Sequence, residues 1–197
     1  VILDASYIGK KGYTIPKSVL PEKELEFLMT DLYLKPQVPG PAFAQAAAAD
    51  TAFPVYRENS NKIYIPRFYG IERYGMPERS ELEPGEDINV SFTKTLRDYQ
   101  QNIVDVYISH VSQPNGTNCG GGILEVYCGS GKTIMALKIV ELLQKKTLIL
   151  VHKEFLMNQW IERIEEFLPG ARVGKIQASV CDCEDKDIVI GMIQTMY

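Results

Sequence analysis

The stretch Cys128-Gly129-Ser130-Gly131-Lys132-Thr133 is the most informative part of this chain. Ahead of it, the apolar run Gly122–Tyr127 predicts a β-strand, and behind it apolar residues recur at helical spacing over 134–143. Glycines let the backbone of such a turn curl so that successive N–H groups point into one concavity, and the start of a helix adds a positive dipole end. A strand, a glycine-rich turn, Gly-Lys-Thr and a helix are the context of a phosphate-binding loop.

In a loop of this kind, the lysine reaches the terminal phosphates and the hydroxyl holds Mg²⁺. We therefore expect Lys132 and Thr133 to be the catalytic residues, with Thr133 as the metal ligand. One departure from the usual pattern is Val126, which stands where a glycine commonly lies five residues before Gly131. The alternative interpretation is an ordinary glycine-rich surface turn with a chance Lys-Thr.

Length and composition are those of a soluble globular protein. The 197 residues allow one large or two small domains, and 45% of them are hydrophobic and 23% charged. The net charge of −4 argues against a large nonspecific nucleic-acid surface but leaves room for a local contact strip. No apolar run is long enough to cross a bilayer, and no secretory signal is visible.

The cysteines indicate a reducing compartment. Cys119, Cys128, Cys181 and Cys183 show neither disulfide nor zinc-ribbon spacing, so we expect reduced thiols in an intracellular protein. Two ligands at Cys181-Asp182-Cys183 do not make a zinc site. The chain begins with Val rather than Met, which suggests a processed protein or a piece of one.

Residues 1–90 differ in character from the rest, and we expect them to form a small, irregular α+β region. They hold most of the prolines. The expected features are a short strand at Val1–Leu3, a helix at Pro21–Met29, an alanine-rich connection at Gly40–Asp50, a hairpin of Phe53–Arg57 with Lys62–Gly70, and a polar linker at Pro77–Asp87.

From Ser91 onward, strands and helices alternate. The continuous apolar run Thr147–Val151 is typical of a parallel strand that is buried on both faces. The other expected elements are helices over Leu96–Val111 and Met157–Leu168, a polar loop over Ser112–Gly121, and strands over Val173–Gln177 and Asp187–Gly191. This order predicts a doubly wound α/β layer with a mainly parallel sheet, over residues 91–197.

Two further groups of residues have the chemistry of binding sites. In Leu96-Arg97-Asp98-Tyr99-Gln100, the Gln100 amide can both donate to and accept from an adenine edge, and Arg97 can assist or bind phosphate. Leu150–Trp160 and Ile190–Thr195 each pass from a strand end into a helix, at the edge of a parallel sheet where ligands bind. Taken singly, each segment is equally compatible with an exposed helix face or a plain connection.

The order of these segments resembles the opening motif series of superfamily 2 helicases and translocases. Their form is similar to the DEAH-type branch, which includes xeroderma-type repair helicases, restriction-type translocases and helicases of large DNA viruses; Lys62–Gly70 also resembles the segment that precedes the motor in such viral proteins. The resemblance implies a RecA-like first lobe over 91–197. It also implies that Arg97 and Gln100 recognise ATP, that Cys128–Thr133 bind its phosphates with Mg²⁺, and that Lys153, Gln194 and Thr195 contact the backbone of DNA or RNA. His152-Lys153 replace the Pro-Thr common in the family.

Such motors hydrolyse ATP with an Asp-Glu pair after a further strand, and the chain has no Asp-Glu dipeptide. Asp187 precedes its expected strand and Glu125 lies within one, so neither replaces that pair. We expect a piece of a helicase that ends before the catalytic acid and before the second lobe, inactive by itself. The alternatives are a non-catalytic nucleotide-binding interaction module and, with less support, a small P-loop phosphotransferase.

Overall fold

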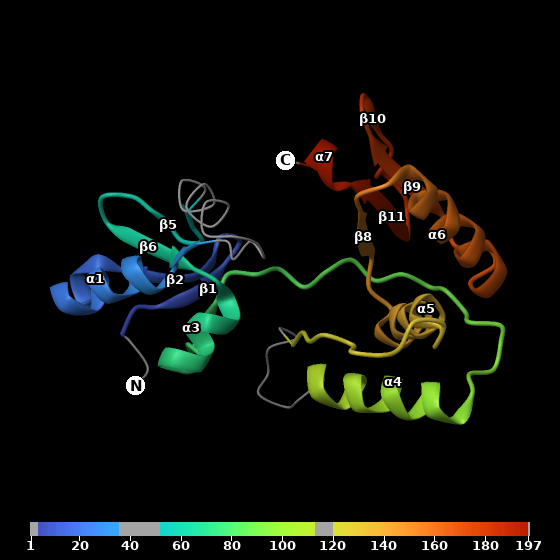
Figure 1. Ribbon diagram of the computed structural model, residues 1–197, viewed down its shortest axis with the longest axis horizontal. Coiled ribbons are helices and arrows are strands. Elements are labelled where there is room, and N and C mark those ends of the chain that lie inside the picture. Colours follow the sequence, from blue (N-terminus) through green and yellow to red (C-terminus); the bar gives the residue numbers. More distant parts are fainter. Residues whose placement is uncertain (1–3, 36–51, 113–119, 197) are drawn as a thin grey trace, which may run out of the picture. The chain divides into compact units, whose positions relative to one another are not determined.

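The computed structural model describes residues 4–35, 52–112 and 120–196 and has two compact units, Val1–Glu83 and Pro84–Tyr197 (Figure 1). The expected strand at 1–3, the alanine-rich connection at 40–50 and Cys119 therefore lie outside the described residues. Residues 84–90, which the composition grouped with the N-terminal region, belong to the second unit, and Val90 lies in its core. No helix of the described part is long and apolar enough to cross a membrane.

The first unit is built around a five-stranded sheet in the order β5-β6-β2-β1-β7. Neighbouring strands are antiparallel except for the parallel pair β1 and β7, and β3 pairs with β4 in a separate ribbon. Its elements are β1 (Tyr7–Gly9), β2 (Gly12–Pro16), the 3-10 helix η1 (Lys17–Val19), α1 (Glu22–Asp31), β3 (Tyr33–Leu34), β4 (Phe53–Pro54), β5 (Arg57–Glu58), β6 (Lys62–Ile65), α3 (Arg67–Tyr74) and β7 (Arg79–Ser80).

The sequence predicted this unit only in part. The helix at 21–29 is confirmed as α1, and the hairpin is confirmed where β5 pairs with β6. Residues 67–70 are helical rather than extended, because Pro66 has no N–H to continue the ladder and stands instead at the N-cap of α3. The hairpin of β1 and β2 was not anticipated, so the unit is more regular than expected.

The second unit is an α/β layer with a mainly parallel sheet, as predicted. The sheet order is β10-β9-β11-β8, and β11 runs parallel to both β9 and β8. Only the short β10 is antiparallel, in a hairpin with β9. The elements are α4 (Asp98–Val111), α5 (Lys132–Leu143), β8 (Thr147–Val151), α6 (Glu154–Phe167), β9 (Val173–Gln177), β10 (Val180–Cys181), β11 (Ile188–Met192) and α7 (Ile193–Met196).

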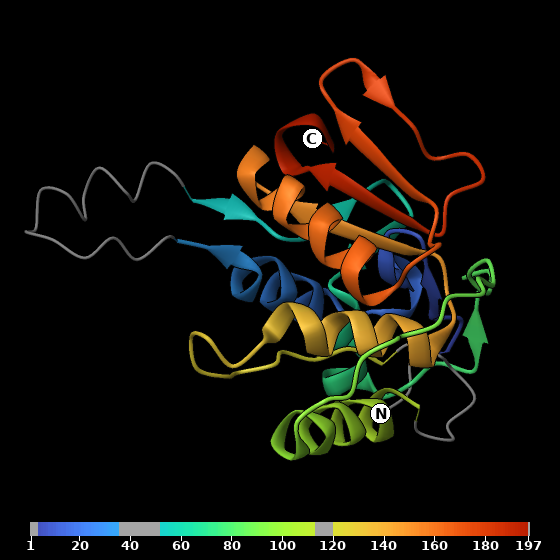
Figure 2. The ribbon, with the colours of Figure 1, turned by 90° about the vertical axis from the view of Figure 1, so that its right-hand side faces the viewer.

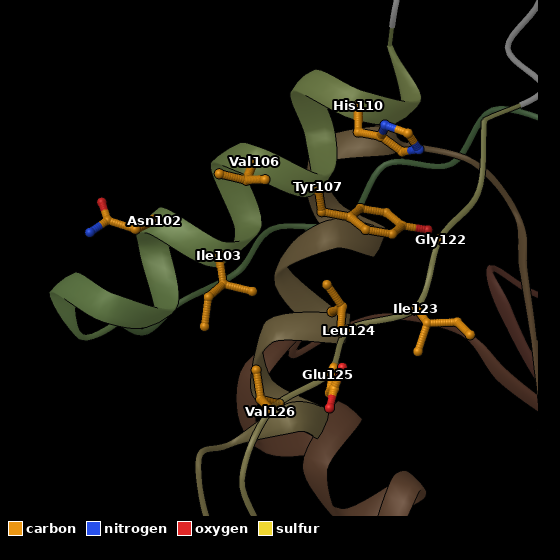
Figure 3. A pocket seen from close by; sticks show the side chains of 10 residues that line it. All are labelled: Asn102, Ile103, Val106, Tyr107, His110, Gly122, Ile123, Leu124, Glu125 and Val126. Atoms are coloured by element: carbon orange, nitrogen blue, oxygen red, sulfur yellow. The ribbon is translucent and has the colours of Figure 1, made fainter.

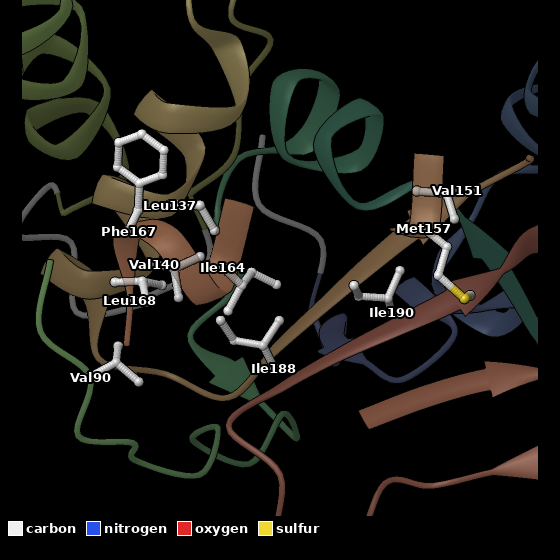
Figure 4. Packing of buried hydrophobic residues seen from close by; sticks show 10 residues of the cluster. All are labelled: Val90, Leu137, Val140, Val151, Met157, Ile164, Phe167, Leu168, Ile188 and Ile190. Atoms are coloured by element: carbon white, nitrogen blue, oxygen red, sulfur yellow. The ribbon is translucent and has the colours of Figure 1, made fainter. Parts of the chain in front are cut away.

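One apolar cluster joins the helices of this unit to its sheet (Figure 4). Ile164 of α6 and Ile188 and Ile190 of β11 are fully buried in it, and Leu137 brings α5 into the same cluster. Figure 2 shows α5 and α6 one above the other, in agreement with their contacts. A second cluster joins α4 to α5 through Val104 and Met135. The glycine-rich loop that leads into α5 therefore starts from a helix that is packed against α4.

Two expectations for the second unit are wrong. Gly122–Tyr127 forms no strand, because a strand needs a hydrogen-bonding neighbour and no described strand pairs with this segment. In β8, burial on both faces is not found: Leu148 and Leu150 are 49% and 52% exposed. The reason is position, since β8 is the edge strand of the described sheet, whereas β11 has a neighbour on both sides.

Candidate nucleotide-binding site

The loop before α5 has the backbone conformation that its glycines allow. Gly129 and Gly131 both have φ of +82°, in the left-handed region that side chains disfavour. Gly131 is the N-cap of α5 and gives the first turn of that helix no side-chain cap. The first N–H groups of α5 therefore keep their donor capacity, and a Cβ at Gly129 would meet nothing within 4 Å. Open space beside uncapped amides at a helix start suits an anion.

Lys132 folds back over its own loop. Its Nζ donates to the carbonyl oxygens of Val126 and Tyr127, at 3.0 and 2.8 Å. These bonds hold the ammonium group beside the turn and use two of its three donors. Lys132 is exposed, so its charge lies at the protein surface. There, the positive end of the helix dipole and the ammonium group both attract anions.

Gln100, which the sequence assigned to adenine, has protein partners in this structure. Its Nε2 donates to the carbonyl oxygen of Ser130 at 2.9 Å, and its Oε1 accepts from the backbone N–H of Arg97 at 3.0 Å. The Tyr99 hydroxyl donates to the same Ser130 carbonyl at 3.1 Å. Gln100 is only 4% exposed. Gln100 thus ties the start of α4 to the loop, a role that only the tertiary structure reveals.

Thr133 lies in the first turn of α5, next to Lys132, and is half-buried. Its hydroxyl is the type of hard oxygen ligand that Mg²⁺ accepts, but a single hydroxyl does not bind the ion without phosphate oxygens and a carboxylate. Within the described ranges, no cluster of three or more His, Cys, Asp or Glu side chains is suited to a metal ion. The residues present therefore fit one part of a magnesium site.

With this geometry in view, comparison with known families identifies the second unit. Residues 93–197 match the family model described as "Type III restriction enzyme, res subunit". The chain belongs to this family. The match begins just before Leu96 and spans every residue that the sequence assigned to a site, and it confirms the resemblance to superfamily 2 helicases.

Individual relatives of this restriction-enzyme-type chain agree with the family assignment. A protein of Acanthamoeba polyphaga mimivirus named "Putative ATP-dependent RNA helicase" is 32% identical over 193 residues, which is 96% of this chain and 36% of the relative. A "Putative helicase" of Invertebrate iridescent virus 3 is 33% identical over 58% of this chain and 35% of the relative. A "Putative ATP-dependent helicase" of Saccharomyces cerevisiae is 30% identical over 51% of this chain and 16% of the relative.

The alignments differ in how much of each protein they cover. The chain spans about a third of the two viral relatives and less of the yeast protein. The mimivirus alignment also extends through the first unit, including Lys62–Gly70, the segment whose likeness to viral proteins the sequence suggested.

The segments after β8 and β11 lie at the carboxyl edge of the sheet, as the sequence predicted, and they are joined there to each other and to the end of β9. Gln194 Nε2, after β11, donates to the carbonyl oxygen of His152, after β8, at 2.9 Å. The Thr195 hydroxyl accepts the backbone N–H of Ala178, after β9, at 3.0 Å. Lys153 is the N-cap of α6 and is exposed at the same edge. This restriction-enzyme-type unit thus joins three strand ends into one hydrogen-bonded rim.

Neither Asp187 nor Glu125 is placed to act as the catalytic acid. Asp187 is 5% exposed, lies at the start of β11, and accepts two hydrogen bonds from the Arg172 guanidinium, at 3.1 and 2.7 Å. Hydrogen bonds from Arg172 hold the pKa of Asp187 below its usual value. The Asp187 carboxylate is therefore a structural ion. Glu125 is exposed beside a pocket of about 550 Å³ between α4 and residues 122–126 (Figure 3).

Sequence reasoning missed one contributor to this site and one contact elsewhere in the unit. Tyr99 was quoted within the motif but given no role, although its hydroxyl reaches the loop. The contact is between Cys181 and Cys183, which are free cysteines, as expected, and whose sulfur atoms lie 3.2 Å apart.

Proposed function

We propose that the second unit binds ATP with its phosphates on the loop Cys128–Thr133, and that the longer protein uses ATP hydrolysis to move along or unwind a nucleic-acid strand. The single observation that carries the nucleotide site is the start of α5. There, Gly131 in a left-handed conformation leaves the first turn uncapped, and the Lys132 ammonium group lies beside it. The names of the relatives support ATP as the nucleotide and helicase action as the outcome.

Each remaining site residue has a role in this proposal. The Lys132 ammonium group neutralises the terminal phosphates, and the Thr133 hydroxyl completes Mg²⁺ binding once phosphate oxygens are present. Magnesium, when bound, withdraws charge from the transferring phosphoryl group. Gln100 sets the position of the Ser130 carbonyl, and the exposed Arg97 is available to the base or the phosphates. Direct contact between Gln100 and adenine stays a prediction.

The rim at the carboxyl ends of the strands is the proposed track for nucleic acid in this motor. Lys153 offers a charge to a phosphate, and Gln194 and Thr195 present polar groups on a backbone already fixed by hydrogen bonds. Groups of this kind bind a phosphate backbone without reading bases. DNA and RNA are therefore both candidate strands.

Hydrolysis itself is proposed for the longer protein. The described part of the chain supplies no acid placed for the attacking water, and the mimivirus relative, of which the aligned part is 36%, is well over twice as long as the chain. We place the Asp-Glu pair and a second lobe with an arginine finger in that additional length, which agrees with the need of such motors for both. Residues 1–83 would then be an accessory unit on the N-terminal side of the motor.

The proposal is tested by titrating the 197-residue chain with a fluorescent ATP analogue and competing with ATP, ADP and GTP. Lys132→Ala removes a charged hydrogen bond worth about 1.5–3 kcal/mol, so binding is expected to weaken about 10- to 150-fold. Lys23→Ala is the matched control, because Lys23 is an exposed lysine on α1 in the other unit and its removal changes the net charge equally.

Two results would contradict the proposal. Equal affinity in Lys132→Ala and in the unchanged chain would indicate a non-catalytic scaffold. Strong ATP turnover by this chain, stimulated by DNA or RNA, would show that it already contains a complete active site.

A further inference from the structure

The face of the first unit's sheet that points away from its core carries a line of aromatic and cationic residues. In the antiparallel and parallel pairs of this sheet, directly opposed residues point to the same side. The register of the strands places five residues in one row across all five strands: Arg57, Tyr64, Thr14, Tyr7 and Arg79.

The other face of the same sheet packs into the hydrophobic core of the first unit. Ile8, Ile15, Ile63 and Ile65 alternate with the row and are at most 1% exposed. They share one cluster with Leu28 and Leu32 from α1 and its C-cap, and with Tyr74 of α3. Because α1 and α3 pack on the isoleucine side, the row forms the outer face, in which Arg57, Tyr64 and Arg79 are exposed or half-exposed and Thr14 and Tyr7 are buried.

Cations lie over both tyrosine rings of this outer face. The Lys11 ammonium group is 4.8 Å from the centre of the Tyr64 ring. The Tyr7 ring has Arg79 at 4.7 Å and Lys62 at 5.1 Å, and Lys62 Nζ also donates to the Tyr7 hydroxyl at 3.1 Å. Such contacts orient positive charge over an aromatic surface. The hydrogen bond to Tyr7 raises the pKa of Lys62, which therefore stays charged at neutral pH.

The outer face also has a local excess of positive charge. Glu81, beside Arg79, is the carboxylate paired with a cation of the row. Arg57, Lys11 and Lys62 add further positive charges, although the whole chain has a net charge of −4. Gly9 has a specific role here, since a Cβ at that position would come within 3.1 Å of the Tyr7 ring. The glycine lets that ring lie against the sheet.

The geometry points to a second nucleic-acid site: the outer face, defined by Tyr7, Lys11, Tyr64 and Arg79 with their neighbours, binds a single strand of DNA or RNA. Aromatic rings on a sheet stack with unpaired bases, and guanidinium planes do the same. Cations between the rings neutralise the phosphates that link those bases. A protein partner with acidic side chains would satisfy the cations but would make no use of the two aromatic platforms.

Access to the Tyr7 ring requires movement of the two cations that lie over it, Arg79 and Lys62. The ring is 8% exposed and lies under Arg79, whose side chain is 64% exposed and is held by a surface ion pair. Surface pairs of this type contribute little, so a phosphate can draw Arg79 away and a base can replace it on the ring. Tyr64 is already half-exposed, with the Lys11 ammonium group over its ring.

This inference does not depend on the phosphate-binding loop, and the experiment keeps the two separate. Fluorescence anisotropy of labelled oligothymidine and oligouridine with the 197-residue chain, without ATP, measures binding to either single strand. Tyr64→Ala is expected to weaken binding about 5- to 150-fold through the loss of one stacked base, and Tyr64→Phe to restore it. Lys11→Gln and Arg79→Gln are each expected to reduce the magnitude of the salt slope by about 0.7.

The controls distinguish this site from the motor. Lys23 lies on α1, and Lys23→Gln makes the same charge change as Lys11→Gln. This control is expected to leave strand binding unchanged. Lys132→Ala is expected to weaken ATP binding and to leave binding of the single strand unchanged. If strand binding survives in Tyr64→Ala, Lys11→Gln and Arg79→Gln but disappears in Lys153→Ala, the outer face is not the site. If Tyr64→Ala does not fold, the two exposed cation variants and Tyr64→Phe decide the result.

Discussion

Replacing Gly131 by alanine tests how the loop is held against α4. Gly131 has φ of +82°, where a Cβ costs about 1–2 kcal/mol. That Cβ would also lie 2.5 Å from Gln100 Nε2, and Gln100 cannot move away without losing its bond to Ser130. The lost bond adds about 0.5–1.5 kcal/mol. The total expected loss of unfolding free energy is about 1.5–3.5 kcal/mol.

Gly129 is the matched control for this substitution. It has the same φ, but a Cβ there would meet nothing within 4 Å, so Gly129→Ala is expected to cost only about 1–2 kcal/mol. The extra cost at Gly131 should depend on Gln100. In a double-mutant cycle, Gly131→Ala in a Gln100→Ala background is therefore expected to cost about as little as Gly129→Ala.

Urea denaturation followed by tryptophan fluorescence measures these differences. Trp160 is the only tryptophan of the chain, and it packs against the core of the second unit, so its emission reports the unfolding of that unit. Equal losses for Gly131→Ala and Gly129→Ala, or no coupling with Gln100, would refute the idea that Gln100 fixes the loop.

Two further outcomes follow from the second unit. Hydrogen bonds from Arg172 lower the pKa of Asp187, so this interaction stabilises the folded unit above the ordinary pKa of 3.8 and is lost as the pH falls through the lower, folded-state value. Asp187→Asn is therefore expected to reduce stability at neutral pH and to flatten its decline in acid, as followed by Trp160 fluorescence; an unchanged acid profile would contradict this. Ile164→Ala, at a fully buried position, is expected to lower the unfolding free energy by about 2–5 kcal/mol. Leu150 is half-exposed on the edge strand β8, so Leu150→Ala should lower it clearly less in the same urea assay.

Local chemistry accounts for most of what the sequence predicted. Helices α4, α5 and α6 were found from apolar spacing and from their end signals, and their observed bounds differ from the expected ones by a few residues. The loop conformation at Gly129 and Gly131 was predictable because left-handed backbone is a property of the residue itself. Gln194 and Thr195 were correctly placed at the sheet edge because parallel strands end on one side.

The missed features all depend on partners that are distant in the chain. The apolar run Gly122–Tyr127 has the composition of a strand, but strand formation requires a neighbouring strand to accept and donate its backbone hydrogen bonds. The turn Gly9–Gly12 is a hairpin signal, and without the hairpin of β1 and β2 the sequence could not place Tyr7 on the same face as Tyr64.

The sequence by itself determined the conformation of the glycine-rich loop, the helices around it and the family, because each depends on short-range spacing and on backbone preferences of single residues. Only the tertiary structure decided that Gln100 binds the loop, that Asp187 pairs with Arg172, and that two tyrosines share one face with a set of cations. The physical reason is that strand register and burial are set by contacts between segments tens of residues apart, and no local pattern specifies which segments will meet.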